Sequence, residues 1–295
     1  KEERDPFAVV NLSLHPEGLF IYVPPKVKLE PVLQLIFFST EEKMVTFPRV
    51  HFFLASSAEL KVVISKEIQG FTHAAFDASL EPSAKLSFLS MPSSLDKKGV
   101  YFSSTRVNLK KDSLFHSLSF STSHELEREA LSIALNGEGA ESLVEGLWML
   151  KGQEQSHTHV LMEHKAQETK SRQHFKGVLA DFSQSSFEGK IYVSSEADKT
   201  EAYQLNQNLL LADHAIAVSR PNLEIFASDV KASHGSTVSQ MDEEMVFYLR
   251  SRGIGEKEAK YLLLKGYLEE MLNKVELSSC QASIHNYVKK FLLSI

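Results

Sequence analysis

The sequence predicts a mainly β-strand fold that ends in a helical tail. From Leu19 to Val230, apolar residues recur in short bursts with a period of two, which is typical of strands with one buried face. No helical stretch of about 10–15 residues separates these bursts, and this argues against alternating βαβ units. After Ser239 the spacing of apolar residues changes to that of amphipathic helices.

The predicted strands are short, rich in Val, Ile, Phe and Leu, and bounded by Ser, Asn, Asp, Gly or Pro. In chain order the clearest are 19–23, 33–37, 49–54, 60–64, 85–89, 113–120, 130–135 and 189–193. Signals for two-residue hairpins are scarce, and Asn136-Gly137 is the clearest of them. The bursts return after polar links of varied length, as stacked coils would produce. This pattern leaves a sandwich, a barrel and a β-solenoid open.

Three helices are predicted in the tail. Residues 242–252 form the first, which Gly253 ends, and residues 255–275 form the second. Ser278 or Ser279 caps the third, whose apolar stripe is Ile284, Val288, Phe291 and Leu292. A helical tail of about 55 residues buries little by itself. We therefore expect it to pack on the strand region, to dock a partner, or both.

Composition excludes several classes of protein. The net charge of −6 argues against a nucleic-acid partner, because phosphate binding needs an excess of Lys and Arg. The longest apolar run, 32–38, is interrupted by Gln34 and is too short for a membrane span. A single cysteine, Cys280, excludes an intrachain disulfide and favours a reducing cytoplasm. One cysteine is also too few for a self-sufficient iron–sulfur protein.

The most informative segment lies where strands give way to helices. It reads Lys231-Ala-Ser-His-Gly-Ser-Thr-Val238 and is followed by Asp242-Glu-Glu and by residues 247–254. A neutral imidazole is a good iron ligand, and a ligand at such a junction can complete a site on another protein. The alternative is that His234 is a surface or packing histidine in a turn before Gly235.

Residues 231–254 resemble the SufD members of the SufB/SufD family, which are scaffold subunits of the SUF iron–sulfur cluster assembly machinery. Other similar stretches follow the family's order: Asp5-Pro-Phe7, 18–24, 135–141, 174–178, 187–191, 204–211 and 221–225. The resemblance implies a right-handed parallel β-helix over residues 1–238 and a C-terminal helical domain over 239–295. It also implies a helical N-terminal region before the core. Because the chain opens on Lys1-Glu-Glu-Arg-Asp, without an initiator Met, we expect it to be a fragment.

The resemblance also implies an assembly site shared between subunits. SufD pairs with its paralogue SufB through the β-helices, and the histidine of the Ser-His-Gly motif, here His234, contributes a ligand to a transient, nascent cluster at their interface. The chain alone would bind no cluster. The cysteine that SufB contributes falls near Asn206, so this chain resembles SufD and not SufB. One departure is Ala232, which replaces the cysteine of the family's usual Lys-Cys-Ser-His-Gly.

The C-terminal helices of SufD bind the ATPase SufC, so the resemblance makes the tail a partner-binding surface. The candidate partner-binding residues are Asp242, Tyr248, Arg250 and Arg252. No G-x-x-x-x-G-K-[ST] phosphate-binding loop occurs in the chain, so ATP hydrolysis would belong to another subunit.

Other polar groups have simpler structural explanations than a site. His157-Thr-His159 places two imidazoles on one face of a strand, but a zinc site needs three or four ligands. Acidic residues 242–244 fit the first turn of a helix, where they complement its dipole. The glycines of Asn136-Gly-Glu-Gly139 lack the context of a nucleotide loop and fit a turn between coils. Cys280 is expected to pack as a small apolar side chain.

Together with the composition, the resemblance implies a non-catalytic, cytoplasmic scaffold subunit for iron–sulfur cluster assembly, with protein partners and neither nucleic acid nor membrane. Two alternatives remain. A β-helix carbohydrate-active enzyme would need paired carboxylates and an aromatic groove, whereas Trp148 is the chain's single tryptophan. A structural homodimer without a metal site would need no partner beyond a second copy.

Overall fold

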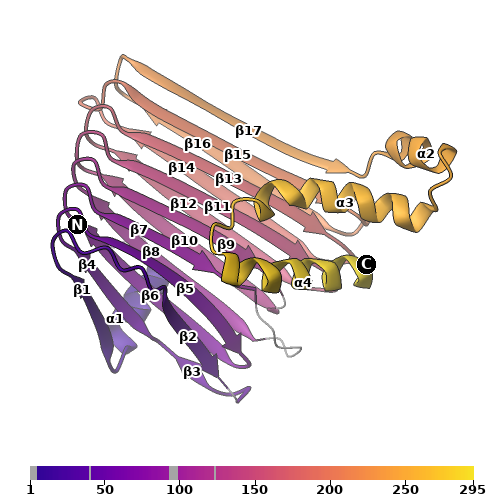
Figure 1. Ribbon diagram of the computed structural model, residues 1–295, viewed down its shortest axis with the longest axis horizontal. Helices are drawn as coiled ribbons and strands as arrows, with labels where there is room; N and C mark the ends of the chain where they lie inside the picture. The colour runs from indigo at the N-terminus through magenta and orange to yellow at the C-terminus, as the bar shows by residue number, and fades with distance from the viewer. Residues whose placement is uncertain (1–4, 40, 93–98, 123) are drawn as a thin grey trace.

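A computed structural model describes residues 5–39, 41–92, 99–122 and 124–295. Its strands are built into two sheets, and successive strands alternate between them from β4 onward (Figure 1). Sheet A contains β1 (Gly18–Val23), β3 (Val45–Thr46), β4 (Arg49–Leu54), β6 (Phe71–Leu80), β8 (Val100–Leu109), β10 (Leu126–Leu135), β12 (Gln155–His164), β14 (Gln184–Val193) and β16 (Ile216–Ile225). Sheet B contains β2 (Leu33–Ser39), β5 (Glu59–Ile68), β7 (Lys85–Ser90), β9 (Leu114–Ser121), β11 (Glu141–Leu150), β13 (Lys170–Leu179), β15 (Thr200–Leu210) and β17 (Val230–Gln240).

The pairing of these strands confirms a parallel β-solenoid. From β4 onward each strand pairs, in parallel, with the strand two positions later in the chain, as β10 does with β12 and β11 with β13. Stacked coils produce this order, whereas antiparallel barrels and sandwiches pair neighbours through hairpins. The ambiguity that the apolar periodicity left is therefore resolved in favour of the solenoid.

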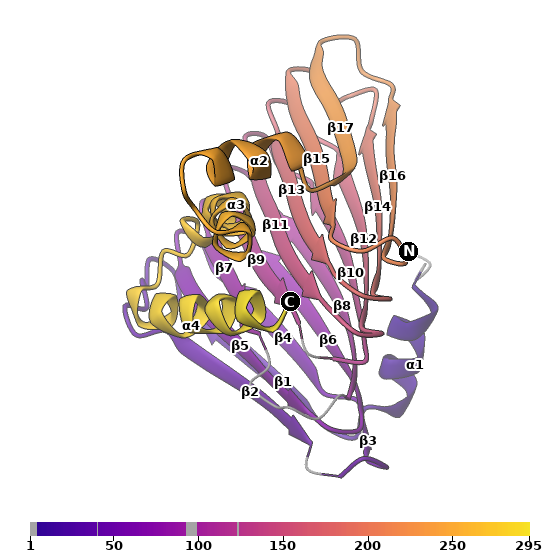
Figure 2. The ribbon, with the colours of Figure 1, turned by 90° about the vertical axis from the view of Figure 1, so that its right-hand side faces the viewer.

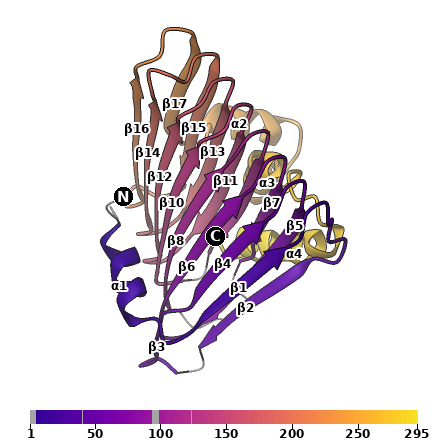
Figure 3. The same cartoon turned by 90° about the vertical axis from the view of Figure 1, so that its left-hand side faces the viewer.

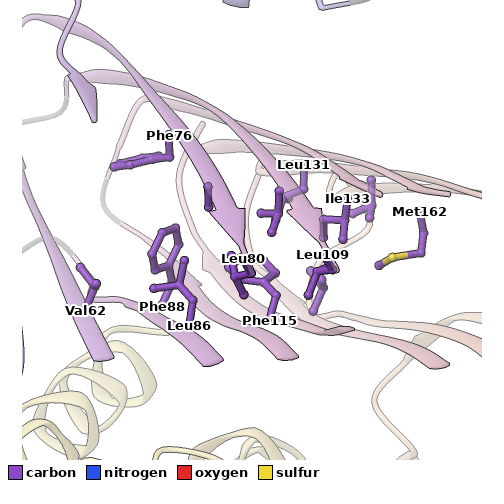
Figure 4. Packing of buried hydrophobic residues seen from close by; sticks show 14 of the residues in the cluster. Val62, Phe76, Leu80, Leu86, Phe88, Leu109, Phe115, Leu131, Ile133 and Met162 are labelled. Atoms are coloured by element: carbon purple, nitrogen blue, oxygen red, sulfur yellow. The ribbon is translucent and has the colours of Figure 1, made fainter. Parts of the chain in front are cut away.

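The core lies between the two sheets and continues from coil to coil. Strand β12 illustrates its origin, since its residues alternate between partly exposed and buried along the whole strand. Inward-facing side chains of successive coils then stack, and the rings of Phe52, Phe88 and Phe115 follow one another at centroid distances of 5.2 and 5.4 Å. Figure 4 shows Phe88 and Phe115 beside the aliphatic side chains of this cluster.

The turns from sheet A to sheet B repeat one unusual conformation. Ser57, Ser83, Asp112, Gly139 and Glu168 all have positive φ angles between 53° and 68°. Each donates its backbone N–H to a carbonyl of the next coil, as Ser83 does to Lys111 at 2.9 Å. This inter-coil bond offsets the steric cost of a left-handed residue. Most of these positions are not glycine, so they leave little signal in the sequence.

The Asn136-Gly-Glu-Gly139 segment forms a turn of the solenoid, as its glycines indicated, and not the hairpin that Asn136-Gly137 can signal. The segment joins β10 to β11, which lie in different sheets, so it forms a turn within a coil and not a two-stranded hairpin. Glycine is required there by space, because a Cβ atom at Gly137 would lie 2.0 Å from the backbone nitrogen of Lys111. The close approach of adjacent coils, and not a hairpin twist, explains this glycine.

The tail forms the three helices that the sequence predicts: α2 (Glu243–Ser251), α3 (Glu256–Leu272) and α4 (Ser278–Ser294). Asp242 caps α2, and Gly253 follows it with a φ angle of 85°. Helices α3 and α4 cover the outer face of sheet B (Figure 2), where Leu268, Met271 and Ile284 join Phe120 and Leu147 in a second buried cluster. None of the helices in the described ranges is both long and apolar enough to cross a membrane.

A fourth helix, α1 (Pro6–Leu14), lies against sheet A on the opposite side of the solenoid from the tail (Figure 3). The strand pattern did not predict it, although Asp5 followed by Pro6 is a helix-start signal. Both apolar and polar contacts hold it there: the ring of Phe7 lies 4.9 Å from that of Phe102, and the buried Asn11 donates to the carbonyl of His73 at 2.7 Å. Its apolar residues Val9 and Leu12 are exposed.

Three residues were expected to point into or along one continuous core: Ile191, Leu210 and Ile225. Ile191 is fully buried and Leu210 packs against the core, whereas Ile225 is in register with the buried Val193 on β14 but is 39% exposed. Ile225 lies on β16, the last strand of sheet A in the described part of the chain, so no further coil covers it.

Candidate functional site

His234 occupies the last rung of an inward-facing column of side chains in sheet B. The column passes from Val144 on β11 to Gln173 on β13, Gln204 on β15 and His234 on β17. Because residues in register on adjacent parallel strands project to the same face of the sheet, His234 lies on the same face as the buried Gln173 and Gln204. The site is therefore placed at the open end of the solenoid, next to its interior.

His234 is exposed, since β17 has no further strand beyond it in the described residues. Within those residues its imidazole forms no hydrogen bond or ion pair, so both ring nitrogens are accessible. Gly235 follows it, and a Cβ atom there would come within 3.2 Å of Leu205. Ala232, two residues earlier on the same face, packs against the core cluster.

The described residues around His234 do not form a complete metal site. No group of three or more His, Cys, Asp or Glu side chains in the described residues is arranged to hold a metal ion. Cys280 lies on α4 and packs against the cluster beneath the helical tail. A metal at His234 that takes three or more such side chains would therefore need ligands from another molecule.

The open end of the solenoid presents an apolar edge. Strands β16 and β17 each end their sheet in the described part of the chain, so one side of each backbone has no strand partner. Such edges invite pairing with another chain. Exposed apolar side chains occur on both strands and after β16: Ile225 and Val238 on the inward faces, Ile216 and Val218 on the outer face of sheet A, and Phe226 beyond the end of β16.

The predicted partner-binding residues of the tail lie in or beside α2. Tyr248 and Arg252 are exposed and contact each other, with the guanidinium 5.3 Å from the ring centroid. Arg250 forms an ion pair with Glu256, and the carboxylate of Asp242 accepts the N–H groups that begin α2. Sequence reasoning missed Phe247, which is 69% exposed and lies beside Tyr248 on the same helix.

The other histidines do not form a site. His157 and His159 share the outer face of sheet A, where His157 contacts Ser186 and Gln155. His164 lies in the interior between Thr169 and Ser171, and burial lowers its pKa to about 4. His174 lies on sheet B, where its Nδ1 is 2.9 Å from Lys274 of the tail. In the described residues these side chains do not converge on one point.

The family is decided by comparison of the whole chain. Residues 37–267 match the family model described as "SUF system FeS cluster assembly, SufBD core domain". The chain belongs to this SufBD core family. The matched region extends from β2 through the solenoid and into α3, and it includes His234.

Curated relatives of this SufBD core chain include bacterial and plant proteins. It is 32% identical over 235 residues to the iron–sulfur cluster assembly protein SufD of Escherichia coli K12, covering 78% of this chain and 55% of that protein. It is 28% identical over 305 residues to the chloroplastic protein ABCI7 of Arabidopsis thaliana, covering 98% of this chain and 63% of that protein. A Synechocystis SufBD family protein is 31% identical over 188 residues, with 64% and 42% covered. The chain thus spans about half of these relatives' length.

Sequence reasoning also missed a buried polar cluster inside this SufBD core solenoid. Lys66, which is only 1% exposed, forms an ion pair with Glu127, and its Nζ lies 5.1 Å from the ring centroid of Tyr101. Glu129 accepts a hydrogen bond from Ser119 at 3.0 Å. The alternation of side chains along the strand could have identified Lys66, because it lies on the inward face of β5 with Val62 and Ile64.

Proposed function

We propose that this chain is a non-catalytic scaffold subunit for iron–sulfur cluster assembly. It would pair with a SufB-like paralogue through the open end of the solenoid, bind a SufC-like ATPase through the helical tail, and offer His234 to a nascent cluster. The observation that carries the proposal is the position of His234. It is a single, unpartnered imidazole at an apolar edge, with its other potential ligands absent from the described surroundings.

The single ligand supports a shared cluster. Iron–sulfur clusters usually need about four ligands, mostly cysteine thiolates. His234 offers one nitrogen, and Ala232 stands where the family commonly has a cysteine. The other ligands would therefore come from the paralogue, and the cluster would be a transient product that leaves the complex. The isolated chain is therefore expected to bind no cluster.

The edge supports pairing. Five exposed apolar side chains and two strand edges lie within the last coil, and stable interfaces bury roughly 1,200–2,000 Å² in total. The same surface could join two copies of this chain when the paralogue is absent, as an isologous dimer. A carbohydrate-active enzyme is less well supported, because Trp148 is buried in the core and cannot line a sugar groove.

The tail supports ATPase binding. Helices α3 and α4 pack on sheet B and bury their apolar residues there. Helix α2 extends beyond the sheet (Figure 1) and carries Phe247 and Tyr248 on its exposed surface. Aromatic and arginine side chains are enriched in the energetically important parts of protein interfaces. The proposed contact surface therefore consists of Phe247, Tyr248 and Arg252.

Phe247→Glu should weaken retention of the ATPase by about tenfold or more, because a charge would replace an aromatic contact in the interface. The full chain, its paralogue and the ATPase are co-expressed, and the ratio of ATPase to scaffold is measured after purification through a tag on this chain. Leu12→Glu is the matched control, since Leu12 is an exposed apolar residue on α1, far from the tail. Equal loss of ATPase in both variants, or no loss in either, would move the docking surface away from α2.

A further inference from the structure

The column that ends at His234 contains two buried amide side chains. Gln173 and Gln204 lie in the solenoid interior, fully or almost fully buried, and Nε2 of Gln204 donates to Oε1 of Gln173 at 2.9 Å. The next rung of the same column is His234. Amide ladders of this kind stack along parallel strands whose residues are in register. Here the ladder ends on an imidazole.

The amide next to the last rung has a free acceptor. Oε1 of Gln204 is buried and has no hydrogen-bond partner in the described residues. The other two amide oxygens on the inward face of β15 are already occupied. Oδ1 of Asn206 accepts from Asn208, and Oδ1 of Asn208 accepts from the indole N–H of Trp148. Buried acceptors are rarely left unpaired in native proteins, so the free oxygen of Gln204 calls for a donor.

The surroundings hold the Gln204 amide in place. Gly189 on β14 lies opposite it, and a Cβ atom at Gly189 would come within 1.8 Å of Nε2 of Gln204. The absence of a side chain at Gly189 therefore makes room for this amide. Gln204 and His234 are in register on adjacent strands, which in a sheet lie about 4.7–4.9 Å apart.

We infer that Gln204 is a positioning residue for His234, with Oε1 of Gln204 accepting one imidazole N–H so that the other ring nitrogen is left bare for a ligand. A neutral imidazole has one N–H donor and one lone-pair acceptor, and the partner of the N–H fixes which nitrogen is free. Histidines that ligate metals almost always donate their other N–H to an oxygen acceptor. The metal-facing part of this inference rests on the proposed function, whereas the tautomer of His234 is a property of this chain alone.

The test measures the tautomer of His234 directly. The full chain is labelled with ¹⁵N-histidine, and the two ring nitrogen shifts are recorded at pH 8, with the His234 signals assigned by their loss in His234→Ala. Gln204→Leu should change the ratio of the two tautomers by about threefold or more, because the leucine offers no acceptor. Gln204→Glu, which keeps an acceptor at the same distance, should retain the wild-type ratio. If the leucine variant fails to fold, Gln204→Asn withdraws the amide by one methylene and should change the ratio in the same direction.

Gln155→Leu is the matched control, because Gln155 contacts His157 on the outer face of sheet A. It should alter the His157 signals and leave those of His234 unchanged. An unchanged His234 tautomer ratio in folded Gln204→Leu or Gln204→Asn would overturn the inference. The result is separable from the fate of the proposed function: if His234 proves dispensable for cluster assembly, the tautomer measurement still decides whether Gln204 holds its ring.

Discussion

Lys66→Met should lower the free energy of unfolding at pH 7 by about 3–5 kcal/mol, because it leaves a buried carboxylate without its counter-charge. Glu127 is buried, and the lysine and His124 hold its pKa at about 2 in spite of the opposing effect of burial. Once the ammonium is removed, Glu127 must either remain charged in the core or bind a proton. Both cost folding energy. The measurement is equilibrium unfolding in urea, with the slope checked for two-state behaviour.

Two further variants separate this effect from general damage to the strand. Lys61→Met changes a lysine on the same strand, but Lys61 is exposed and pairs with Glu276 on the surface, so we expect a change of about 0–1 kcal/mol. The double variant Lys66→Met/Glu127→Leu removes both charges and should regain most of the lost stability. A double variant as unstable as Lys66→Met would mean that packing, and not the unpaired carboxylate, accounts for the loss.

Glu129→Gln should stabilise the protein at pH 8 and have little effect at pH 4.5. Burial, together with repulsion from Glu127, raises the pKa of Glu129 to about 7 from its ordinary value of 4.5, although Lys66 acts in the opposite direction. A group whose pKa is raised by folding stabilises the folded state fully below its unfolded value. That contribution is lost as the pH rises through about 7. Glutamine cannot ionise and so avoids the loss.

The size of the gain follows from the shift. The full difference between the pKa values of Glu129 in the unfolded and folded states corresponds to about 3 kcal/mol of folding free energy. Because Glu129 as a whole residue is only partly buried, we expect Glu129→Gln to raise the free energy of unfolding at pH 8 by about 1–3 kcal/mol. The measurement is the difference in unfolding free energy between wild type and Glu129→Gln across pH 4.5–8.5. A constant difference over this range would contradict the assignment of a carboxyl that titrates near neutrality.

Local patterns predicted the elements of this fold better than their pairing. The alternation of apolar and polar residues predicted the strands, and Gly253 marked the end of α2. The partner of each strand lies about one coil away and leaves no local signal, so the resemblance to a family, and not periodicity, favoured the solenoid. The repeated turns were hidden for another reason. Residues such as Ser83 and Asp112 adopt a left-handed conformation that inter-coil hydrogen bonds stabilise, although composition favours glycine there.

The candidate site, too, could be predicted from the sequence only in part. His234 could be chosen from its motif, and its exposed position on the last rung agrees with that choice without testing its role. The buried acceptor of Gln204 could not be predicted, because it depends on which atoms Gln173, Asn206 and Asn208 leave unpaired. The division of the chain at residues 238 and 239 into two domains stays a prediction, since α3 and α4 share a buried cluster with sheet B.

The central claim is that His234 supplies a ligand to a cluster assembled between subunits. The most direct measurement is the iron and acid-labile sulfide content of the complex of this chain with its SufB-like paralogue and the ATPase, co-expressed and purified without oxygen. His234→Ala should leave folding and complex formation intact, because a substitution of an exposed side chain usually changes stability by no more than about 0.5 kcal/mol. Its iron and sulfide content should fall by about tenfold or more relative to wild type. His159→Ala, on the outer face of sheet A, should retain the wild-type content. If the intact His234→Ala complex carries as much iron and sulfide as wild type, His234 is not a cluster ligand.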